Sequence, residues 1–327
     1  MGGKRPSRTA AVDRLLRGDR RTLAKLITGA EAGSPEARQV LRAIYGKTGK
    51  ATVVGFTGPL GVGKSSLINR TVNFLREKGL RVGVIAIDPS SPFTGGALLG
   101  DRVRLERREG DTGVFVRSMA TRGHSGGVAQ GTRDVIRLME AFGMDVIIVE
   151  TVGSGQSDVD IHDVAATRVV VLVPHLGDDV QSLKAGLFEI ADVFAVNKSD
   201  LPGAMEAARH LKEMVTIIAP RNGWRPSVVE SSAAAGEGIA ELWKAVEDHQ
   251  RFLREHHLDA KESGERRATE VSDLVRGHLQ TVLRDLLEHD PEARKLMEEV
   301  ADGRVDPYSG AERLVARISK TSVGAPR

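Results

Sequence analysis

The distribution of apolar residues along the chain changes character twice. Between residues 11 and 45 apolar side chains recur every three to four positions, which is typical of amphipathic helices, and Gly33-Ser34-Pro35 breaks this stretch into pieces. From Ala51 onward, short apolar runs alternate with helical stretches. These runs predict strands over residues 51–57, 81–87, 145–149, 169–173, 193–196 and 227–230. After about Arg251 the strand pattern stops, and helical spacing continues to Ile318.

The apolar runs are short and show no polar alternation, which suits strands that are covered on both faces in a parallel sheet. The sequence therefore predicts an α/β fold with a doubly wound, mostly parallel sheet. We expect an N-terminal helical extension over 1–47, a central domain over 48–250 and a C-terminal helical arm over 251–327. The arm carries an apolar stripe that must pack on the core or on another subunit, and the charged stretch 259–267 predicts a mobile linker.

Composition narrows the class of protein. The 327 residues include 47 Lys and Arg against 44 Asp and Glu, a net charge of +3, and this mixed surface is a poor footprint for nucleic acid. The absence of cysteine excludes disulfides and Cys-built zinc or iron–sulfur sites. No apolar run approaches the ~18 residues of a membrane span, and the basic stretch 1–21 contains no apolar run like that of a signal peptide. We expect a cytoplasmic protein with no nucleic-acid or membrane partner.

One motif indicates the chemistry. Residues 58–65, Gly-Pro-Leu-Gly-Val-Gly-Lys-Ser, match the phosphate-binding loop pattern G-x-x-x-x-G-K-[ST] and lie between a predicted strand and a predicted helix. Its glycines let backbone N–H groups surround phosphate oxygens, Lys64 can reach the β- and γ-phosphates, and Ser65 can ligate Mg²⁺. The sequence therefore predicts a P-loop NTPase fold. The expected nucleotide-binding residues here are Gly58, Gly61, Val62, Gly63, Lys64, Ser65 and Ser66.

A second motif indicates the base. Asn197-Lys198-Ser199-Asp200 follows directly on the predicted strand 193–196. The carboxylate of Asp200 can accept hydrogen bonds from the ring N–H and the exocyclic amine of guanine, an edge that adenine does not present. Ser232, Ala233 and Ala234 follow the next strand. Together with Asn197, Lys198 and Asp200 they predict a guanine site, so the expected ligands are GTP and GDP.

Carboxylates end two of the predicted strands. Asp88 follows the run 81–87 and Glu150 follows the run 145–149, which places both at the carboxyl edge of a parallel sheet, beside the phosphate-binding loop. Oxygen ligands suit Mg²⁺, and Asp101 is a further candidate. The glycine-rich stretch 150–156 predicts a switch loop that senses the γ-phosphate. The histidines, including His249, show no metal-ligand spacing and are expected to have packing or surface roles.

These motifs resemble those of the MeaB/ArgK family, GTPases that act as chaperones of adenosylcobalamin-dependent methylmalonyl-CoA mutase and its relatives. The resemblance covers nearly the whole chain. Besides the two nucleotide motifs, it rests on Asp88-Pro89-Ser90-Ser91, Thr94-Gly95-Gly96, Leu99-Gly100-Asp101, Gly126-Gly127-Val128, Glu150-Thr151-Val152-Gly153, Gly155-Gln156-Ser157 and Gly177-Asp178 with Gln181 and Lys184.

The resemblance implies a role for each of these positions. Ser65, Asp88, Asp101 and Glu150 would form the Mg²⁺ environment, and the catalytic group would be Lys64, Asp88, Glu150 and Lys184. The switch loops would include Gly153, Gln156, Asp178 and Gln181, and the loop from Gly177 to about Gly186 would couple mutase docking to GTP hydrolysis. The C-terminal helices would form a homodimer. The implied function is to gate cofactor loading and to protect or reactivate an adenosylcobalamin-dependent acyl-CoA mutase.

The chain departs from the usual family pattern at three places: Ser154, residues 174–178 and residues 117–120. We place these departures in loops that face the partner. They favour a client other than methylmalonyl-CoA mutase, for example a mutase that acts on isobutyryl- or 2-hydroxyisobutyryl-CoA. Two other functions remain open: a GTP-dependent phosphotransferase, for which the sequence shows no acceptor-activating base, and a nickel metallochaperone GTPase, which the lack of cysteines and clustered histidines disfavours.

Overall fold

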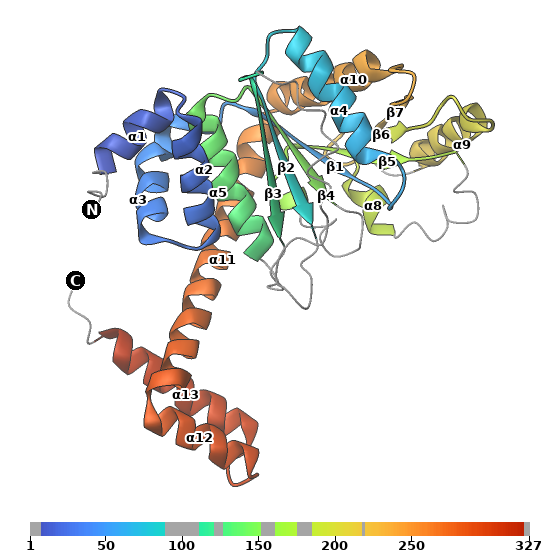
Figure 1. Cartoon of the computed structure of the whole chain (residues 1–327). Helices are drawn as coiled ribbons and strands as arrows, with labels where there is room; N and C mark the ends of the chain where they lie inside the picture. Colours follow the sequence, from blue (N-terminus) through green and yellow to red (C-terminus); the bar gives the residue numbers. More distant parts are fainter. Residues whose placement is uncertain are drawn as a thin grey trace. The chain divides into compact units, whose positions relative to one another are not determined.

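The computed structural model of the chain describes residues 8–88, 111–120, 127–151, 161–174, 185–217 and 220–323 (Figure 1). By its internal contacts the chain divides into two compact units, one that ends at Arg266 and one that comprises Arg267–Arg327. The first contains the whole sheet, and the second is helical. The predicted domain boundaries at residues 47 and 250 stay predictions.

The first unit is built around a seven-stranded parallel sheet. In spatial order its strands are β3 (Val114–Ala120), β2 (Val82–Asp88), β4 (Val146–Thr151), β1 (Thr52–Thr57), β5 (Thr167–Leu172), β6 (Val193–Val196) and β7 (Ser227–Glu230). Every pair of neighbours is parallel. Strands β2 to β4 lie on one side of β1 and β5 to β7 on the other, so the direction of winding reverses at β1. This arrangement confirms the predicted doubly wound fold.

Strand β3 is the one strand of this sheet that the apolar pattern did not predict. It pairs with β2 alone, at the edge of the sheet. An edge strand is covered less completely than a central one, and β3 accordingly interrupts its apolar residues with Arg117 and Ser118 and leaves Val116 41% exposed. The sequence signal is weak here because the strand does not have two buried faces.

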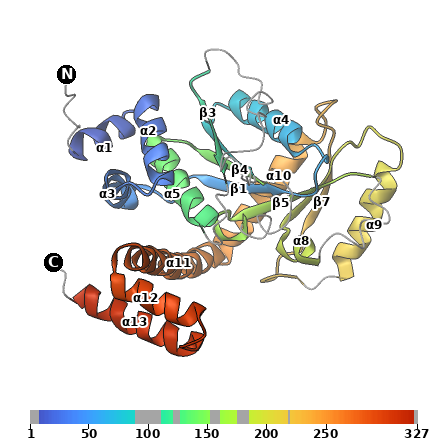
Figure 2. The ribbon, with the colours of Figure 1, turned by 60° about the horizontal axis from the view of Figure 1, so that its bottom comes forward.

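The central strands place alternate side chains in different clusters. On β4, Val146 and Ile148 belong to a cluster with helices α4 (Lys64–Glu77) and α10 (Ile239–Glu255). The intervening Ile147 and Val149 belong to a cluster on the other face. That face is covered by α5 (Gly127–Phe142) and by α1 (Arg8–Leu16), α2 (Arg20–Glu31) and α3 (Pro35–Ile44) (Figures 1 and 2). The three-layer arrangement explains why these strands read as continuous apolar runs.

A third cluster covers the β5 and β6 half of the same face. Val170, Leu172 and Phe194 pack there against helix α9 (Ala204–Ile217), with α8 (Ala185–Ile190) beside it. Two short 3₁₀ helices, η1 (Tyr45–Lys47) and η3 (Ile161–Asp163), complete the described connections of the first unit.

Side-chain caps fix the starts of the N-terminal helices. The carboxylate of Asp19 accepts from the backbone N–H groups of Arg21 and Thr22 at the start of α2. The hydroxyl of Ser34 accepts from the backbone N–H of Ala37 at the start of α3, where Pro35 is the first helical residue. Such caps satisfy N–H groups that have no partner inside the helix. The break predicted at Gly33-Ser34-Pro35 therefore coincides with the capped start of α3.

Helices α11 (Leu258–His289), α12 (Pro291–Ala301) and α13 (Pro307–Val323) follow the sheet. The prediction of a linker over 259–267 was wrong, because these residues belong to α11. Asp290 caps α12 and also binds the guanidinium of Arg317 on α13. The second unit leaves an apolar stripe of α11 exposed, formed by Val271, Leu274, Val275 and Leu279. In the described part of the chain, no helix is long and apolar enough to cross a membrane.

A buried ion pair lies near the amino ends of β5 and β6. Nε of Arg168 donates to Oδ2 of Asp192 at 2.6 Å and its Nη2 donates to Oδ1 at 2.9 Å, and both side chains are almost fully buried. Asp192 also accepts from the backbone N–H of Arg168 and from Arg221. His249 packs beside this pair, and its Nδ1 lies 2.9 Å from the Thr167 hydroxyl. Burial and the charge of Arg168 lower the pKa of His249 to about 3, so its imidazole is neutral. The packing role expected for His249 is confirmed.

We expect Asp192→Asn to destabilise the first unit by about 3–5 kcal/mol, because it leaves the Arg168 guanidinium buried without a counter-charge. The free energy of unfolding, measured by urea denaturation, tests this. Asp248→Asn is the control, since Asp248 pairs with Lys244 at the surface and its loss should cost less than about 1 kcal/mol. Equal losses in the two variants would contradict the prediction.

Candidate nucleotide-binding site

The phosphate-binding loop begins where β1 ends, at the point where the sheet reverses its direction of winding. Residues 58–63 connect β1 to α4, and ligands of open α/β sheets bind at this kind of position. Gly58 has φ 139°, and a side chain there would place its Cβ 2.2 Å from the carbonyl oxygen of Val171 on β5. Gly63 has φ 87°, and its Cβ would lie 2.6 Å from Nδ2 of Asn197. These two glycines allow the loop to lie directly against the neighbouring segments.

Lys64 is the first residue of α4 and is 6% exposed. Its ammonium donates to the carbonyl oxygens of Gly58 at 2.6 Å and Pro59 at 2.8 Å. The ammonium therefore lies under the loop that precedes its own helix. In this position it is close to the backbone that would surround phosphate oxygens, as the motif predicts.

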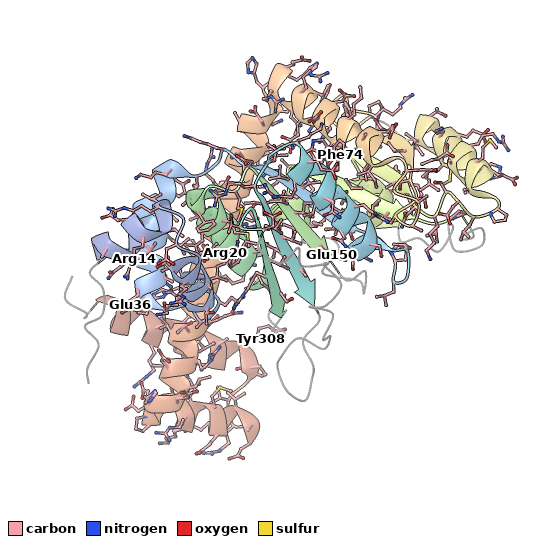
Figure 3. All side chains as sticks on the ribbon, turned by 45° about the horizontal axis from the view of Figure 1, so that its top comes forward. Arg14, Arg20, Glu36, Phe74, Glu150 and Tyr308 are labelled. Atoms are coloured by element: carbon pink, nitrogen blue, oxygen red, sulfur yellow. The ribbon has the colours of Figure 1, made fainter. Side chains whose placement is uncertain are left out.

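Ser65 and Glu150 are brought together from α4 and β4. The Ser65 hydroxyl donates to Oε1 of Glu150 at 2.6 Å, and Glu150 lies near the carboxyl end of its strand (Figure 3). Asp88 is the last residue of β2, and in the β-ladder it lies two positions beyond Ala86, the partner of Glu150. The hydroxyl and carboxylate oxygens are the ligand type that Mg²⁺ prefers. Within the described ranges no group of three or more His, Cys, Asp and Glu side chains could hold a metal ion.

Asn197 links the predicted phosphate side of the site to the predicted base side. Its side chain is buried, and Nδ2 donates to the carbonyl oxygen of Val62 at 2.8 Å. Its Oδ1 accepts from the backbone N–H of Ala233 at 3.1 Å. Both polar atoms of the amide therefore have backbone partners, one in each of two loops that are far apart in the sequence. The predicted Asn-Lys-x-Asp motif has a structural function besides any contact with a base.

The rest of the motif follows β6 directly. Lys198 has φ 60°, and its ammonium donates to the carbonyl oxygen of Gly61 at 3.0 Å. Asp200 accepts a short hydrogen bond from the Ser232 hydroxyl. The backbone N–H of Ser199 donates to the carbonyl oxygen of Ser231. Predicted nucleotide-binding residues from three separate segments therefore converge at one edge of the sheet.

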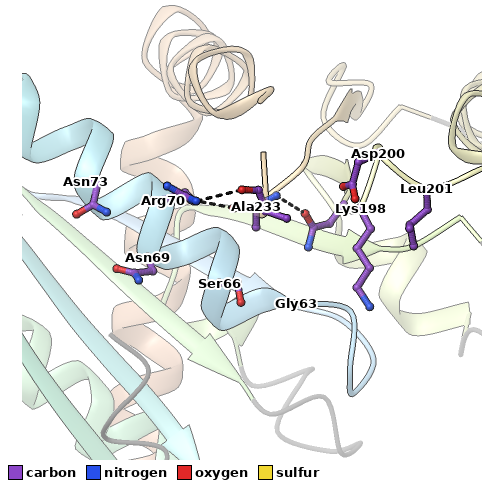
Figure 4. A pocket seen from close by; sticks show the side chains of 11 residues that line it. Gly63, Ser66, Asn69, Arg70, Asn73, Lys198, Asp200, Leu201 and Ala233 are labelled. Atoms are coloured by element: carbon purple, nitrogen blue, oxygen red, sulfur yellow. Dashed lines mark hydrogen bonds between the residues drawn. The ribbon is translucent and has the colours of Figure 1, made fainter. Parts of the chain in front are cut away.

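A cavity of about 490 Å³ opens at this edge (Figure 4). Of the predicted nucleotide-binding residues it is lined by Gly63, Ser66, Asn197, Lys198, Asp200, Ala233 and Ala234. The sequence prediction missed Asn69, Arg70, Asn73 and Leu201. Three of these lie on α4, where the spacing of residues 66, 69, 70 and 73 forms one polar helix face. That spacing is a signal in the sequence that could have identified them.

Several predicted site residues lie outside the described residues: Asp101, Gly153, Gln156, Asp178, Gln181 and Lys184, together with two of the three departures, at Ser154 and at most of 174–178. One expectation is corrected. The sequence predicts residues 117–120 in a partner-facing loop, but they form the second half of strand β3, where Arg117 pairs with Glu31 of α2. The mixture of apolar and polar residues in this segment is typical of an edge strand.

The family model described as methylmalonyl-CoA mutase-associated GTPase MeaB matches residues 23–287. The chain belongs to the MeaB family. It is therefore a GTPase. A Pyrococcus abyssi protein with a provisional GTPase name is 45% identical over 310 residues, 94% of this chain and 95% of that protein.

Two further relatives of the family carry more specific names. GTPase ArgK of Escherichia coli is 38% identical over 74% of this chain and 76% of its own length. The mouse protein named methylmalonic aciduria type A homolog, mitochondrial, is 32% identical over 92% of this chain and 77% of its own length. Among solved structures, one described as a LAO/AO transport system kinase matches with a TM-score of 0.68 and 26% identity, over 98% of this chain and 100% of that chain.

We expect Gly58→Ala to disrupt the loop and to weaken GTP binding by more than about 100-fold, because its Cβ would meet the Val171 carbonyl and the backbone conformation favours glycine. Gly61→Ala is the matched control. Gly61 also has a positive φ, 79°, but nothing lies within 4 Å of its Cβ position, so only the strain of about 1–2 kcal/mol applies. Titration with a fluorescent GTP analogue measures both affinities. Similar losses in the two variants would show that the contact with β5 does not matter.

Proposed function

We propose that this GTPase is a chaperone of an adenosylcobalamin-dependent acyl-CoA mutase, methylmalonyl-CoA mutase or a relative such as isobutyryl- or 2-hydroxyisobutyryl-CoA mutase. It would gate cofactor loading and protect or reactivate the mutase. The family model, named for its association with methylmalonyl-CoA mutase, and the mouse relative named for methylmalonic aciduria support this proposal. The observation that carries the nucleotide part is that Gly63 of the phosphate-binding loop lines one cavity together with Asn197, Lys198 and Asp200.

In the proposed arrangement GTP lies along the carboxyl edge of the sheet. Its phosphates contact the backbone of residues 58–63, and the ammonium of Lys64 balances the charge on the β- and γ-phosphates. Its base lies against Ala233 and Ala234, and the carboxylate of Asp200 accepts from the N–H groups that guanine presents. The Ser232 hydroxyl supports this, because its hydrogen bond holds one carboxylate oxygen of Asp200 in place.

Ser65 and Glu150, with Asp88, are the residues that would hold Mg²⁺. A hydroxyl has one proton and two acceptor lone pairs, so Ser65 can donate to Glu150 and still offer a lone pair to a cation. When bound, Mg²⁺ neutralises charge on the phosphate oxygens and orients the triphosphate. Glu150 then orients the Ser65 ligand, a role typical of a carboxylate behind a metal ligand.

The proposed assembly includes a homodimer. The exposed stripe of α11 supports it, because Val271, Leu274, Val275 and Leu279 are each about half exposed in the single chain. Contiguous apolar surface of this kind marks interaction sites in globular proteins. The mass of the particle in solution, from light scattering, tests this part separately from the activity.

The base contact predicts a switch in nucleotide preference. We expect Asp200→Asn to weaken GTP binding by about 100-fold or more, because its amide presents a donor to the guanine amine instead of an acceptor. The same amide can donate to the 2-oxo group of xanthine, so binding of xanthosine triphosphate should strengthen. Competition titrations with both nucleotides measure the change. If xanthosine triphosphate gains nothing, the assignment of Asp200 to the base is wrong.

GTP hydrolysis with and without the mutase tests the chaperone proposal. Turnover should be slow in the isolated protein and should rise severalfold with one purified adenosylcobalamin-dependent acyl-CoA mutase, with ATP as the control nucleotide. With γ-labelled GTP, the label should appear as inorganic phosphate. A response to no mutase would refute the chaperone role, and transfer of the label to an acceptor would favour a phosphotransferase instead.

A further inference from the structure

Arg70 is a cavity residue that none of the nucleotide motifs includes. It lies on α4, about two helical turns after the phosphate-binding loop, and lines the cavity beside Ala233 and Ala234. Its Nε donates to the carbonyl oxygen of Ala233 at 2.8 Å, and its Nη2 donates to the carbonyl oxygen of Ala234 at 3.1 Å (Figure 4). One side chain therefore holds two consecutive carbonyls of the loop that borders the base.

These contacts complete a closed path of hydrogen bonds through the site. Asn197 joins the Val62 carbonyl to the Ala233 N–H, and Arg70 joins the Ala233 carbonyl to α4. Helix α4 begins at Lys64, two residues after Val62. The phosphate-binding loop and the base-bordering loop are thus connected twice, once through Asn197 and once through Arg70.

Each peptide unit is planar, with its C=O and N–H groups pointing in opposite directions. When Arg70 fixes the Ala233 carbonyl on one side, it also fixes the Ala234 N–H on the other. The Ala233 N–H is already directed by Asn197. Two side chains therefore fix the peptide groups on either side of Ala233, and one of these side chains, Arg70, lies outside the guanine motifs. A guanidinium suits this role because its donors lie in one plane and can reach adjacent acceptors.

We propose that Arg70 is a positioning residue that sets the affinity of the site for guanine nucleotides by holding Ala233 and Ala234 in their binding conformation. It touches neither the phosphates nor the base in this role. Its removal should raise the KM for GTP and the Kd for GDP while leaving kcat nearly unchanged, because the groups around the phosphates keep their own contacts. The proposal rests on the assignment of the cavity to the guanine nucleotide.

Three variants of the full chain test it. Arg70→Ala should raise the KM for GTP and the Kd for GDP about 5- to 30-fold and change kcat less than about twofold. This range is the loss of two hydrogen bonds of about 0.5–1 kcal/mol each, converted at tenfold per 1.4 kcal/mol. Arg70→Lys keeps the charge but has a single donor group, so it should recover part of the affinity. Lys78→Ala removes the same charge from the end of α4, where Lys78 lies over the Phe74 ring, and should leave all constants unchanged.

The readouts separate the possible outcomes. Equal effects of Arg70→Ala and Lys78→Ala would mean that only the long-range charge matters. Unchanged affinity in Arg70→Ala would mean that Ala233 and Ala234 keep their conformation without Arg70. Either result would overturn the proposal. A fall in kcat at constant KM would also overturn it. Unfolding curves of each variant exclude loss of fold as the cause, and Arg70→Lys retains the test if Arg70→Ala is unstable. If Asp200→Asn gains xanthosine triphosphate binding while Arg70→Ala has no effect, the nucleotide assignment stands and only this inference fails.

Discussion

The buried amide of Asn197 is the interaction on which the geometry of the site depends. It fills the space that the absence of a side chain at Gly63 leaves open, and it bonds to both the phosphate-binding loop and the loop after β7. A hydrogen bond in such a buried position is costly to lose, because the backbone groups left behind have no water to replace it. The glycine and the asparagine therefore form one unit. Either residue alone would leave a clash or two unpaired backbone groups.

The two ends of the sheet use buried polar groups differently. At the carboxyl end, the polar side chains of the site bond mainly to backbone carbonyls, and several line a cavity. At the amino end of β5 and β6, Arg168 and Asp192 form an ion pair with each other, and His249 packs beside them in neutral form. The first arrangement keeps groups available to a ligand, whereas the second uses its charges to fix β5 against the start of β6. This difference follows from the parallel sheet, in which all strands point their carboxyl ends toward the same edge.

The sequence predicted the central strands well, because a strand buried on both faces is mainly apolar, as residues 146–149 of β4 and 169–172 of β5 are. It missed β3, whose position at the edge permits Arg117 and Ser118. It predicted the phosphate-binding loop and residues 197–200 because each motif combines several residues that have a defined chemical role at fixed spacing. The polar face of α4 indicates Arg70 as a cavity residue, but the sequence could not predict its role, because its partners are backbone carbonyls 163 and 164 residues away and backbone atoms leave no signature in the sequence. The prediction of a linker over 259–267 was wrong for a different reason. High charge density is compatible with an exposed helix as well as with a linker.

The described parts of the site suggest how a rigid and a responsive region can share one nucleotide. The phosphate-binding loop, residues 197–200 and residues 232–235 are joined by Asn197, Arg70 and the Ser232–Asp200 hydrogen bond, which would preorganise the proposed base side for the nucleotide. Glu150 belongs to this framework through Ser65, yet it also stands one residue before the end of β4, next to the glycine-rich stretch predicted to switch. A change in the charge at the γ-phosphate would reach Glu150 through Ser65 and would alter the start of that stretch. The base side would hold the nucleotide meanwhile, because its contacts do not depend on the γ-phosphate. In such a design, hydrolysis changes the state of the GTPase without first releasing the nucleotide, which is what a partner that reads the difference between GTP and GDP requires.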